Sequence, residues 1–426
     1  MNRLAAACLD RPFAAVLCVS AACHAAAAWS GVEPVGAGVP SSSAPAVEGM
    51  RPAKGFVVTD GEFRLRISGW AQFRYLMNFR DNPAPDSGGN HDSGFASGFE
   101  TAKTRLQAAG TVLDPNLRFR IEGEFSRTSG EFGLLDAWSS YTFTDGWLEG
   151  ATIRGGQFKM PLLREQLVPD TAALTMERSV VDSVFSQGRS QGVDARWQDD
   201  RIRLTGGLGD GIGSLNTRYT SSSESDVALT GRMEFKWGDG DWVRFEDSPG
   251  WKLSPYAGMA GVAFHWQHSG NTATPGSGSP GPVSQSDLLM YTADVTSEGD
   301  GWSVFASFVG SHLSGDNGAP GFDDFGLVAQ GAMFLTGQDE VFVRWDTVFP
   351  DGNRTGNDPF NTLTAGYNHF FVPESHALKF TADVCWFLDS TTSNSLVAAR
   401  LNGRNGLLAD SEGNQFCVRF QLQMMF

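Results

Sequence analysis

The sequence has no long hydrophobic run after its first 28 residues. No later stretch holds 18 uncharged apolar residues, which excludes a membrane-spanning helix from that part. Cysteine is rare, because three of the 5 cysteines lie within residues 1–28 and only Cys385 and Cys417 remain. Lysine is also scarce, and the histidines show no metal-ligand spacing. The sequence therefore predicts neither a metal site nor any other cofactor.

Glycine and aromatic residues are abundant instead. The chain holds 51 glycines, 31 phenylalanines and 12 tryptophans, which suits many strands joined by tight turns. Residues 414–426 alternate: apolar residues from Phe416 to Phe426 occupy one row, and polar residues occupy the row between them. A period of two indicates a strand with one apolar and one wet face. A chain that ends on an aromatic residue of such a strand is typical of bacterial outer-membrane barrels.

The chain divides into three predicted parts. Residues 1–28 predict a secretory signal peptide, with Arg3 near the start, a short apolar stretch over 12–22 and small residues before the end. Residues 29–60 are rich in Gly, Ser and Pro and predict a flexible leader. Residues 61–426 predict the folded domain.

Sixteen strands are expected in this domain, and the connections between them alternate in length. Short turns at one rim and long loops at the other, with an apolar and a polar row along each strand, are typical of barrels in lipid. We therefore predict an all-β fold, a sixteen-stranded antiparallel transmembrane β-barrel with an inward-folded constriction loop. The even strand count places both termini on the periplasmic side of a bacterial outer membrane. The expected strands are 62–78, 100–113, 116–127, 134–143, 148–158, 190–198, 201–209, 226–237, 251–267, 286–297, 301–312, 323–335, 338–349, 361–371, 376–389 and 414–426.

Basic residues gather in the inward rows of the first eight strands, although the whole chain has a formal charge of −16. One interpretation is a basic rail for anions, because low-dielectric walls focus such a field into the lumen. The other is that these arginines pair with inward carboxylates and only stiffen the barrel. The predicted rail is Arg64, Arg66, Arg74, Arg105, Arg118, Arg120 and Arg154.

The link over 159–189 is the longest connection in the first half and is strongly apolar. Such a segment would not lie bare in water, so we expect it to fold into the barrel mouth and narrow the lumen. A buried plug or an external lid is the alternative. Cys385 and Cys417 fall in the polar rows of adjacent strands, nearly opposite each other. Either a disulfide or two unpaired thiols is compatible with that placement.

Several motifs near this link resemble the phosphate-selective porins of the O/P type. The resemblance is carried by Gly156-Gln157-Phe158-Lys159-Met160-Pro161, Glu165, Met176-Glu177-Arg178-Ser179, and Arg189 with Gly192. The first strand, 67–75, is similar to that family's opening strand. The resemblance implies a trimeric porin whose third extracellular loop constricts the channel, and which conducts anions along arginines and a ring of lysines. The residues placed at the constriction are Lys159, Arg164, Arg178 and Arg189.

The chain departs from this family at Leu162-Leu163-Arg164 and in its few lysines. The prediction is therefore a porin for passive diffusion of small polar solutes, in particular anions such as phosphate, and not an enzyme. Expected partners are these solutes, outer-membrane lipid and two further copies of the chain, without nucleic acid. The competing hypotheses are a surface-interaction barrel and an outer-membrane hydrolase, which would need a nucleophile and a base within reach of each other.

Overall fold

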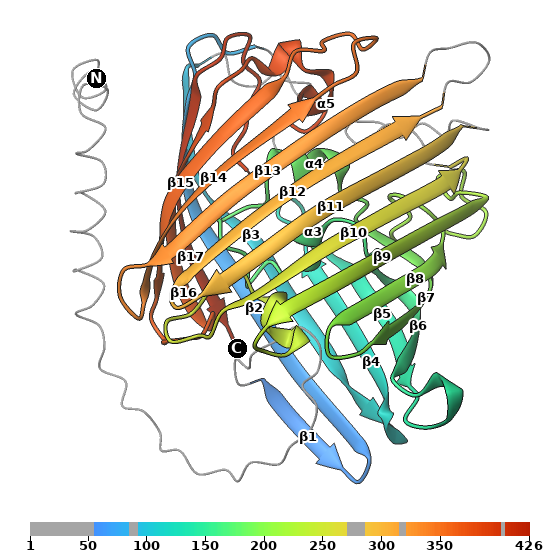
Figure 1. Ribbon diagram of the computed structural model, residues 1–426. Coiled ribbons are helices and arrows are strands. Elements are labelled where there is room, and N and C mark those ends of the chain that lie inside the picture. The colour runs from blue at the N-terminus through green and yellow to red at the C-terminus, as the bar shows by residue number, and fades with distance from the viewer. Residues whose placement is uncertain (1–54, 85–92, 271–285, 315–320, 402–404) are drawn as a thin grey trace. The chain divides into compact units, whose positions relative to one another are not determined.

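The computed structural model describes residues 55–84, 93–270, 286–314, 321–401 and 405–426, and the predicted signal peptide and most of the predicted leader lie outside these ranges. Sixteen antiparallel strands, β2 to β17, form one closed barrel (Figure 1). The strands are β2 Phe63–Phe79, β3 Phe95–Val112, β4 Asp114–Phe125, β5 Phe132–Thr142, β6 Ala151–Lys159, β7 Arg189–Gln198, β8 Ile202–Gly209, β9 Val227–Gly238, β10 Ala257–His268, β11 Asp287–Gly299, β12 Trp302–Leu313, β13 Phe322–Phe334, β14 Asp339–Phe349, β15 Phe360–Phe370, β16 Leu378–Phe387 and β17 Gln415–Met425. The described helices are η2 Gly146–Leu148, α3 Arg164–Leu167, α4 Val180–Phe185, η3 Trp242–Glu246, η4 Thr391–Ser393 and α5 Ser395–Ala398.

Each strand of the barrel pairs with its neighbours in sequence, and the first and last strands close the ring. Residues Trp70–Phe79 of β2 pair with Phe416–Met425 of β17. Phe426 continues this pairing, because its backbone N–H donates to Gly69 O and its own carbonyl accepts from Gly69 N. Closure leaves the wall without a free sheet edge, which is what a β-structure in lipid requires. The predicted fold class and strand count are confirmed.

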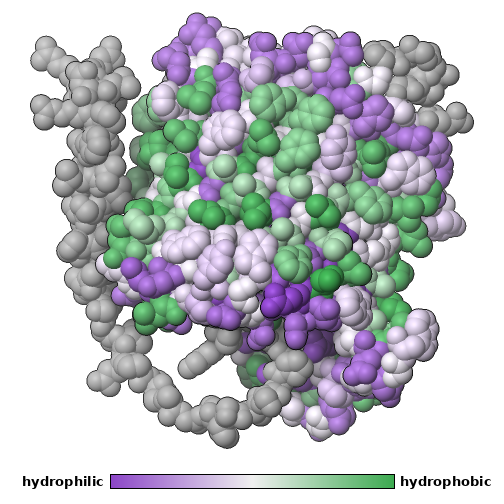
Figure 2. Space-filling model, in the orientation of Figure 1, coloured by the Kyte–Doolittle hydropathy of each residue, from purple (hydrophilic) through white to green (hydrophobic). Residues whose placement is uncertain are grey.

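The outer wall is apolar, as the alternation predicted. Ile67 and Phe73 on β2 and Met233 on β9 are about half exposed, whereas Gln72 and Arg232 on the inward rows are buried. On the face drawn in Figure 2, hydrophilic residues gather at the two rims and hydrophobic residues are most frequent between them. Charge on a lipid-facing position costs about 2–4 kcal/mol at the midplane, which explains this sorting. Among the described residues, no helix is long and apolar enough to cross a membrane.

A seventeenth strand, β1 (Phe56–Asp60), lies within the last residues of the predicted leader and was not expected. It pairs with Phe63–Ile67 at the start of β2. Its Phe-Val-Val-Thr sequence favours a strand, and Gly61 adopts the positive φ of 57° that a tight hairpin turn needs. The β1–β2 hairpin therefore extends the sheet beyond the stretch of β2 that pairs with β17.

The connections alternate in length with two exceptions. One is around β5, where the six residues 126–131 at the long-loop rim are fewer than the eight residues 143–150 at the opposite rim. The other is the β9–β10 connection. At the rim where the chain makes short turns, which we call the turn rim, β7 and β8 are joined by three residues, 199–201. At that same rim, residues 239–256 join β9 and β10 and include η3. The sequence prediction began the β10 strand at 251, six residues too early. Pro255 lacks a backbone N–H and therefore disfavours strand pairing over 251–256.

The two cysteines lie directly opposite each other, since Cys385 pairs with Cys417 in the β16–β17 register. Both thiols are free and buried, so the unpaired alternative describes this structure. Next to them, Arg419 and Asp383 form a bidentate ion pair with Nε–Oδ1 and Nη2–Oδ2 distances of 2.6 and 2.7 Å. Both side chains are fully buried, so each charge depends on the other for solvation.

We predict that Asp383→Asn destabilises the barrel by about 3–5 kcal/mol, because it leaves the Arg419 guanidinium buried without a countercharge. Denaturant-induced unfolding in micelles, followed by unheated gel migration, measures the change. The exposed turn residue Asp145 supplies the control, and Asp145→Asn is expected to change the free energy of unfolding by less than about 0.5 kcal/mol. Equal stability of the two variants would contradict the role of the ion pair.

Candidate functional site

Residues 160–188, which we call the inner segment, join β6 to β7 and contact strands on opposite sides of the barrel. Arg232 on β9 donates to Leu162 O at 3.0 Å, and Arg74 on β2 donates to Met176 O at 3.1 Å. Lys379 on β16 donates to Ala173 O at 2.9 Å. These donors all come from inward rows, so the inner segment runs between the walls of the barrel. Wall side chains thus satisfy three backbone carbonyls that lie outside the short helices of the segment.

The apolar side of the inner segment packs against one half of the inner wall. Val181, Val184 and Phe185 of α4 are buried, and they form a single core cluster with inward residues of β11 to β17. These wall residues are apolar where the alternation led us to expect a wet lumen. They are Leu288, Met290, Val309, Val328, Val348, Phe360, Cys385, Phe387 and Cys417. The inner segment thus lies close to β11–β17 and leaves the remaining space beside β3–β9.

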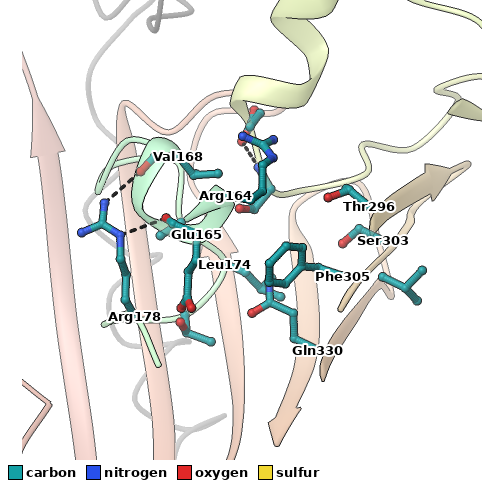
Figure 3. Close-up of a pocket in the computed structure, with 14 residues that line it drawn as sticks. Arg164, Glu165, Val168, Leu174, Arg178, Thr296, Ser303, Phe305 and Gln330 are labelled. Carbon is teal, nitrogen blue, oxygen red and sulfur yellow. Dashed lines mark hydrogen bonds between the residues drawn. The ribbon is translucent and has the colours of Figure 1, made fainter. Parts of the chain in front are cut away.

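Two polar residues fix the turn between α3 and α4. Arg178 donates through Nε to Glu165 O at 3.0 Å and through Nη2 to Val168 O at 2.8 Å (Figure 3). The Glu165 carboxylate accepts from the backbone N–H and the hydroxyl of Ser179, at 2.7 and 2.6 Å. Ser179 in turn caps α4 by accepting from Asp182 N. Arg178 therefore holds the inner segment together.

Asp170 connects the inner segment to the wall. Its carboxylate lies 2.8 Å from Lys103 Nζ and 2.8 Å from Arg105 Nη1 on β3, and 2.8 Å from Arg178 Nη1. Burial disfavours the charged form, but Arg178, Lys103 and Arg105 outweigh burial and hold the pKa of Asp170 well below its usual range. The carboxylate stays ionised and neutralises part of a strongly basic surrounding.

A cavity of about 170 Å³ lies between the inner segment and strands β3–β9. Nine basic and five acidic residues line it, so its wall carries a net positive charge. The space on the other side of the segment, between α3 and β11–β13, is about 40 Å³, room for only about three waters (Figure 3). The wider space is therefore the basic one. Its basic residues are Arg105, Arg120, Arg154, Lys159, Arg164, Arg189, Arg196, Arg203 and Arg232.

Three of the four residues predicted for the constriction line this cavity. Lys159 ends β6 and donates to Gln166 O at 2.7 Å, and Arg189 pairs with Asp136 at 2.6 Å. Arg164 is buried at the start of α3, and its Nε atom has no hydrogen-bond partner among the residues that the structure describes. Arg178 does not line the cavity, because its guanidinium is occupied by the carbonyls and carboxylate of its own segment.

The predicted rail divides in the same way. Arg105, Arg120 and Arg154 line the cavity, and each is also paired with a carboxylate, such as Arg154 with Asp194 at 3.1 Å. The remaining four rail residues lie elsewhere. Arg64 and Arg66 precede the part of β2 that pairs with β17, Arg118 lies near the turn end of β4, and Arg74 is buried against Glu177.

Arg196, Arg203 and Arg232 complete the lining but were not among the predicted site residues. Their inward parity marked them as lumen residues, but nothing local in the sequence marks them as neighbours of the inner segment. Glu246, from the β9–β10 connection, also lines the cavity. No motif in this connection indicates a role in the pore.

With this geometry in place, the chain can be compared with known proteins. The family model described as phosphate-selective porin O and P matches residues 73–268. This is the family whose motifs the sequence resembles. The match runs from β2 to β10 and includes the inner segment and all nine basic lining residues. The resemblance is confirmed, and together with the closed barrel it supports an outer-membrane porin.

Solved structures of outer-membrane barrels share the fold at low identity. An anion-selective porin from Comamonas acidovorans is 14% identical, with 86% of this chain and 100% of that chain covered and a TM-score of 0.57. OmpF of Salmonella typhi is 11% identical, with 87% and 100% covered and a TM-score of 0.56. OmpT of Vibrio cholerae is 9% identical, with 87% and 100% covered and a TM-score of 0.54. No curated protein sequence matches the chain.

We predict that Asp170→Asn loosens the inner segment, because Lys103, Arg105 and Arg178 lose a shared carboxylate. Limited proteolysis in micelles should cut within 160–188 at least about tenfold faster, which corresponds to about 1.4 kcal/mol. A depressed pKa stabilises the folded state above the ordinary value near 3.9, so the difference should persist from pH 7 to 5 and vanish only at lower pH. Exposed Asp200 provides the matched control, and identical cleavage of Asp170→Asn and Asp200→Asn would contradict the anchoring role.

Proposed function

We propose that the chain is a passive porin that favours small anions, and that the inner segment constricts its pore on the β3–β9 side. The observation that carries this proposal is the excess of basic over acidic residues around the wider of the two spaces beside the segment. A low-dielectric wall of this charge raises the local concentration of anions and lowers that of cations. No energy-coupling domain was recognised in the sequence, so flow follows the gradient.

Carboxylates limit the anion preference without abolishing it. Glu122 lies 3.2 Å from Arg105 and 2.9 Å from Arg120, and Asp136 pairs with Arg189. These bonds hold the guanidinium groups against the wall. The side chains therefore do not extend across the basic cavity and block it. The four basic residues in excess of the five acids supply the field. Phosphate is one anion that fits such donors. Because lysine is scarce in this chain, we do not extend the family's phosphate selectivity to it.

The processing, assembly and orientation of the chain follow as parts of this proposal. A signal peptide at 1–28 would direct export, and the turn rim would face the periplasm together with both termini of the mature chain. Assembly as a homotrimer is supported by the family resemblance and by an OmpT structure described as a trimer form, whose fold is similar at a TM-score of 0.54. Unheated gel migration of the purified protein would report the trimer.

A porin without enzymatic activity also suits the described histidines. His268, His312 and His369 each face an aspartate, at 3.0, 2.8 and 2.7 Å, and these pairs lie on separate strand pairs. His265 is buried and bonds to Thr230 and Gln267. His369 and Asp339 both meet the Tyr367 hydroxyl, but none of these bonds joins a histidine and a carboxylate to a serine, threonine or cysteine nucleophile. A lipid-hydrolysis assay on the purified barrel tests this part, and turnover would favour the enzyme hypothesis.

The reversal potential of the reconstituted channel across a KCl gradient tests the proposed pore. We expect the reversal potential to be shifted from zero toward the equilibrium potential of chloride. A cation-selective channel would contradict the anion preference and leave the porin intact. A bilayer that shows no conductance would instead favour the surface-interaction hypothesis.

Arg164→Gln and Arg196→Gln should each shift the permeability ratio toward cations by about two- to fivefold, because one unit charge several ångströms from an ion is worth about 0.5–1 kcal/mol in water. Arg118 is the matched control, since it belongs to an inward row of β4 but does not line the cavity. Arg118→Gln should leave the ratio unchanged. Equal shifts in all three variants would show that the cavity beside the inner segment is not the conducting path.

A further inference from the structure

The connection 239–256 crosses the mouth of the barrel at the turn rim. At one end, Trp242 of η3 donates its indole N–H to Asp199 O in the β7–β8 turn at 2.7 Å. At the other, Asp247 lies 2.7 Å from His376 Nε2 in the β15–β16 turn. These two turns are eight strands apart in a ring of sixteen, so the connection reaches from one side of the opening to the other. We call it the crossing turn.

The crossing turn is anchored by aromatic packing as well as by hydrogen bonds. Trp251 lies against Phe334, Phe370 and His376, with ring centroids 4.8 to 5.5 Å apart. Its carbonyl accepts from Gly301 N in the β11–β12 turn at 3.2 Å. Trp242 lies beneath the Arg203 guanidinium, 4.3 Å from it. A connection held at so many points has a defined position in the opening.

The crossing turn also touches the inner segment, and the two together separate two cavities. Ser248 N donates to Ala172 O at 3.3 Å. A cavity of about 360 Å³ lies between the crossing turn and the rim. It shares two lining residues, Thr171 and Glu246, with the basic cavity. Solutes in the wider space would therefore pass these residues between the basic cavity and the turn rim.

The charge of the rim cavity is opposite to that of the basic cavity. Its acidic lining residues are Asp241, Glu246, Asp247 and Glu298, against Arg244 and His376. Glu298 is 1% exposed, and its Oε1 atom pairs with Arg244 while its Oε2 atom has no hydrogen-bond partner among the described residues. A buried carboxylate oxygen without a donor is an acceptor for a cationic or hydroxyl group brought by a solute.

We propose that the crossing turn is a second selectivity element, an acidic cation-accepting site in series with the basic cavity. A solute that moves through the pore then meets the cationic donors of the basic cavity and the carboxylate acceptors of the rim cavity in succession. The solutes favoured by this order carry both an anionic group and an ammonium group, as small zwitterions do. This inference rests on the proposed channel function and names the substrate class of that pore.

Shortening the crossing turn tests its place in the path. Gly238 pairs with Ala257, so deletion of 241–256 leaves Asp239-Gly240 as a two-residue hairpin loop of a favoured type. Single-channel conductance of this variant should rise at least about twofold, because an obstruction across the mouth is removed. An unchanged conductance in a folded, heat-modifiable barrel would overturn the proposal.

Point variants leave the length of the turn unchanged and test the charge of the rim cavity, which Glu246 of the turn and Glu298 of β11 both line. In a KCl gradient, Glu246→Gln and Glu298→Gln should each raise the chloride-over-potassium permeability ratio about twofold, the size expected for one screened charge at a few ångströms. Glu149, an exposed acid on the β5–β6 turn of the same rim, is the matched control. If Glu149→Gln shifts the ratio as much as the other two, or if none shifts it, the proposal is wrong.

Liposome swelling tests the solute class directly. Swelling in glycine, a zwitterion, should exceed swelling in the similarly sized anion acetate for the wild type, and Glu298→Gln should reduce the ratio of the two rates. A glycine rate at or below the acetate rate in the wild type would overturn the zwitterion assignment. Wild-type protein that neither conducts nor swells would refute the channel itself, a result distinct from a working channel whose variants behave alike.

Discussion

The packing of α4 against the apolar half of the inner wall is the interaction on which the lumen depends. A sixteen-stranded barrel would otherwise enclose a wide aqueous space. Burial of Val181, Val184 and Phe185 against β11–β17 is worth on the order of 1.5–3 kcal/mol for each side chain. This contribution holds the inner segment against β11–β17. The part of the lumen that remains open is therefore bounded by β3–β9.

The distribution of charge follows from that placement. The strands opposite the apolar patch carry the arginines, and the basic cavity lies beside them. Few of these arginines act as isolated charges. Arg105 alone lies within 3.2 Å of Glu122, Glu124 and Asp170. The pairs with inward carboxylates that one interpretation expected are therefore present. The rail for anions stays a prediction, and it would use the same guanidinium groups where they face the cavity.

The strands could be predicted from the sequence because every strand of the wall obeys the same rule: apolar residues face lipid, polar residues face the lumen, and the two alternate. Alternation placed β2 to β17 within a few residues, including the direct opposition of Cys385 and Cys417. The lining of the basic cavity could be predicted only in part, since no local pattern reports which inward residue meets the inner segment. Arg178 looked like a pore residue but bonds to its own segment, and Arg196 faces the cavity from a strand that carries no motif.

The crossing turn escaped prediction for a different reason. The sequence predicts a strand from 251, although β10 begins at Ala257 and Trp251 packs inward on Phe334 and Phe370 instead of joining the sheet. Periodicity identifies a residue's face only once its strand is known, so it cannot separate an aromatic anchor in a folded turn from an aromatic residue in the wall. A turn of eighteen residues at a rim of short turns is itself the better signal. A turn has no need of that length to join two neighbouring strands, so its extra residues must be explained by what they contact.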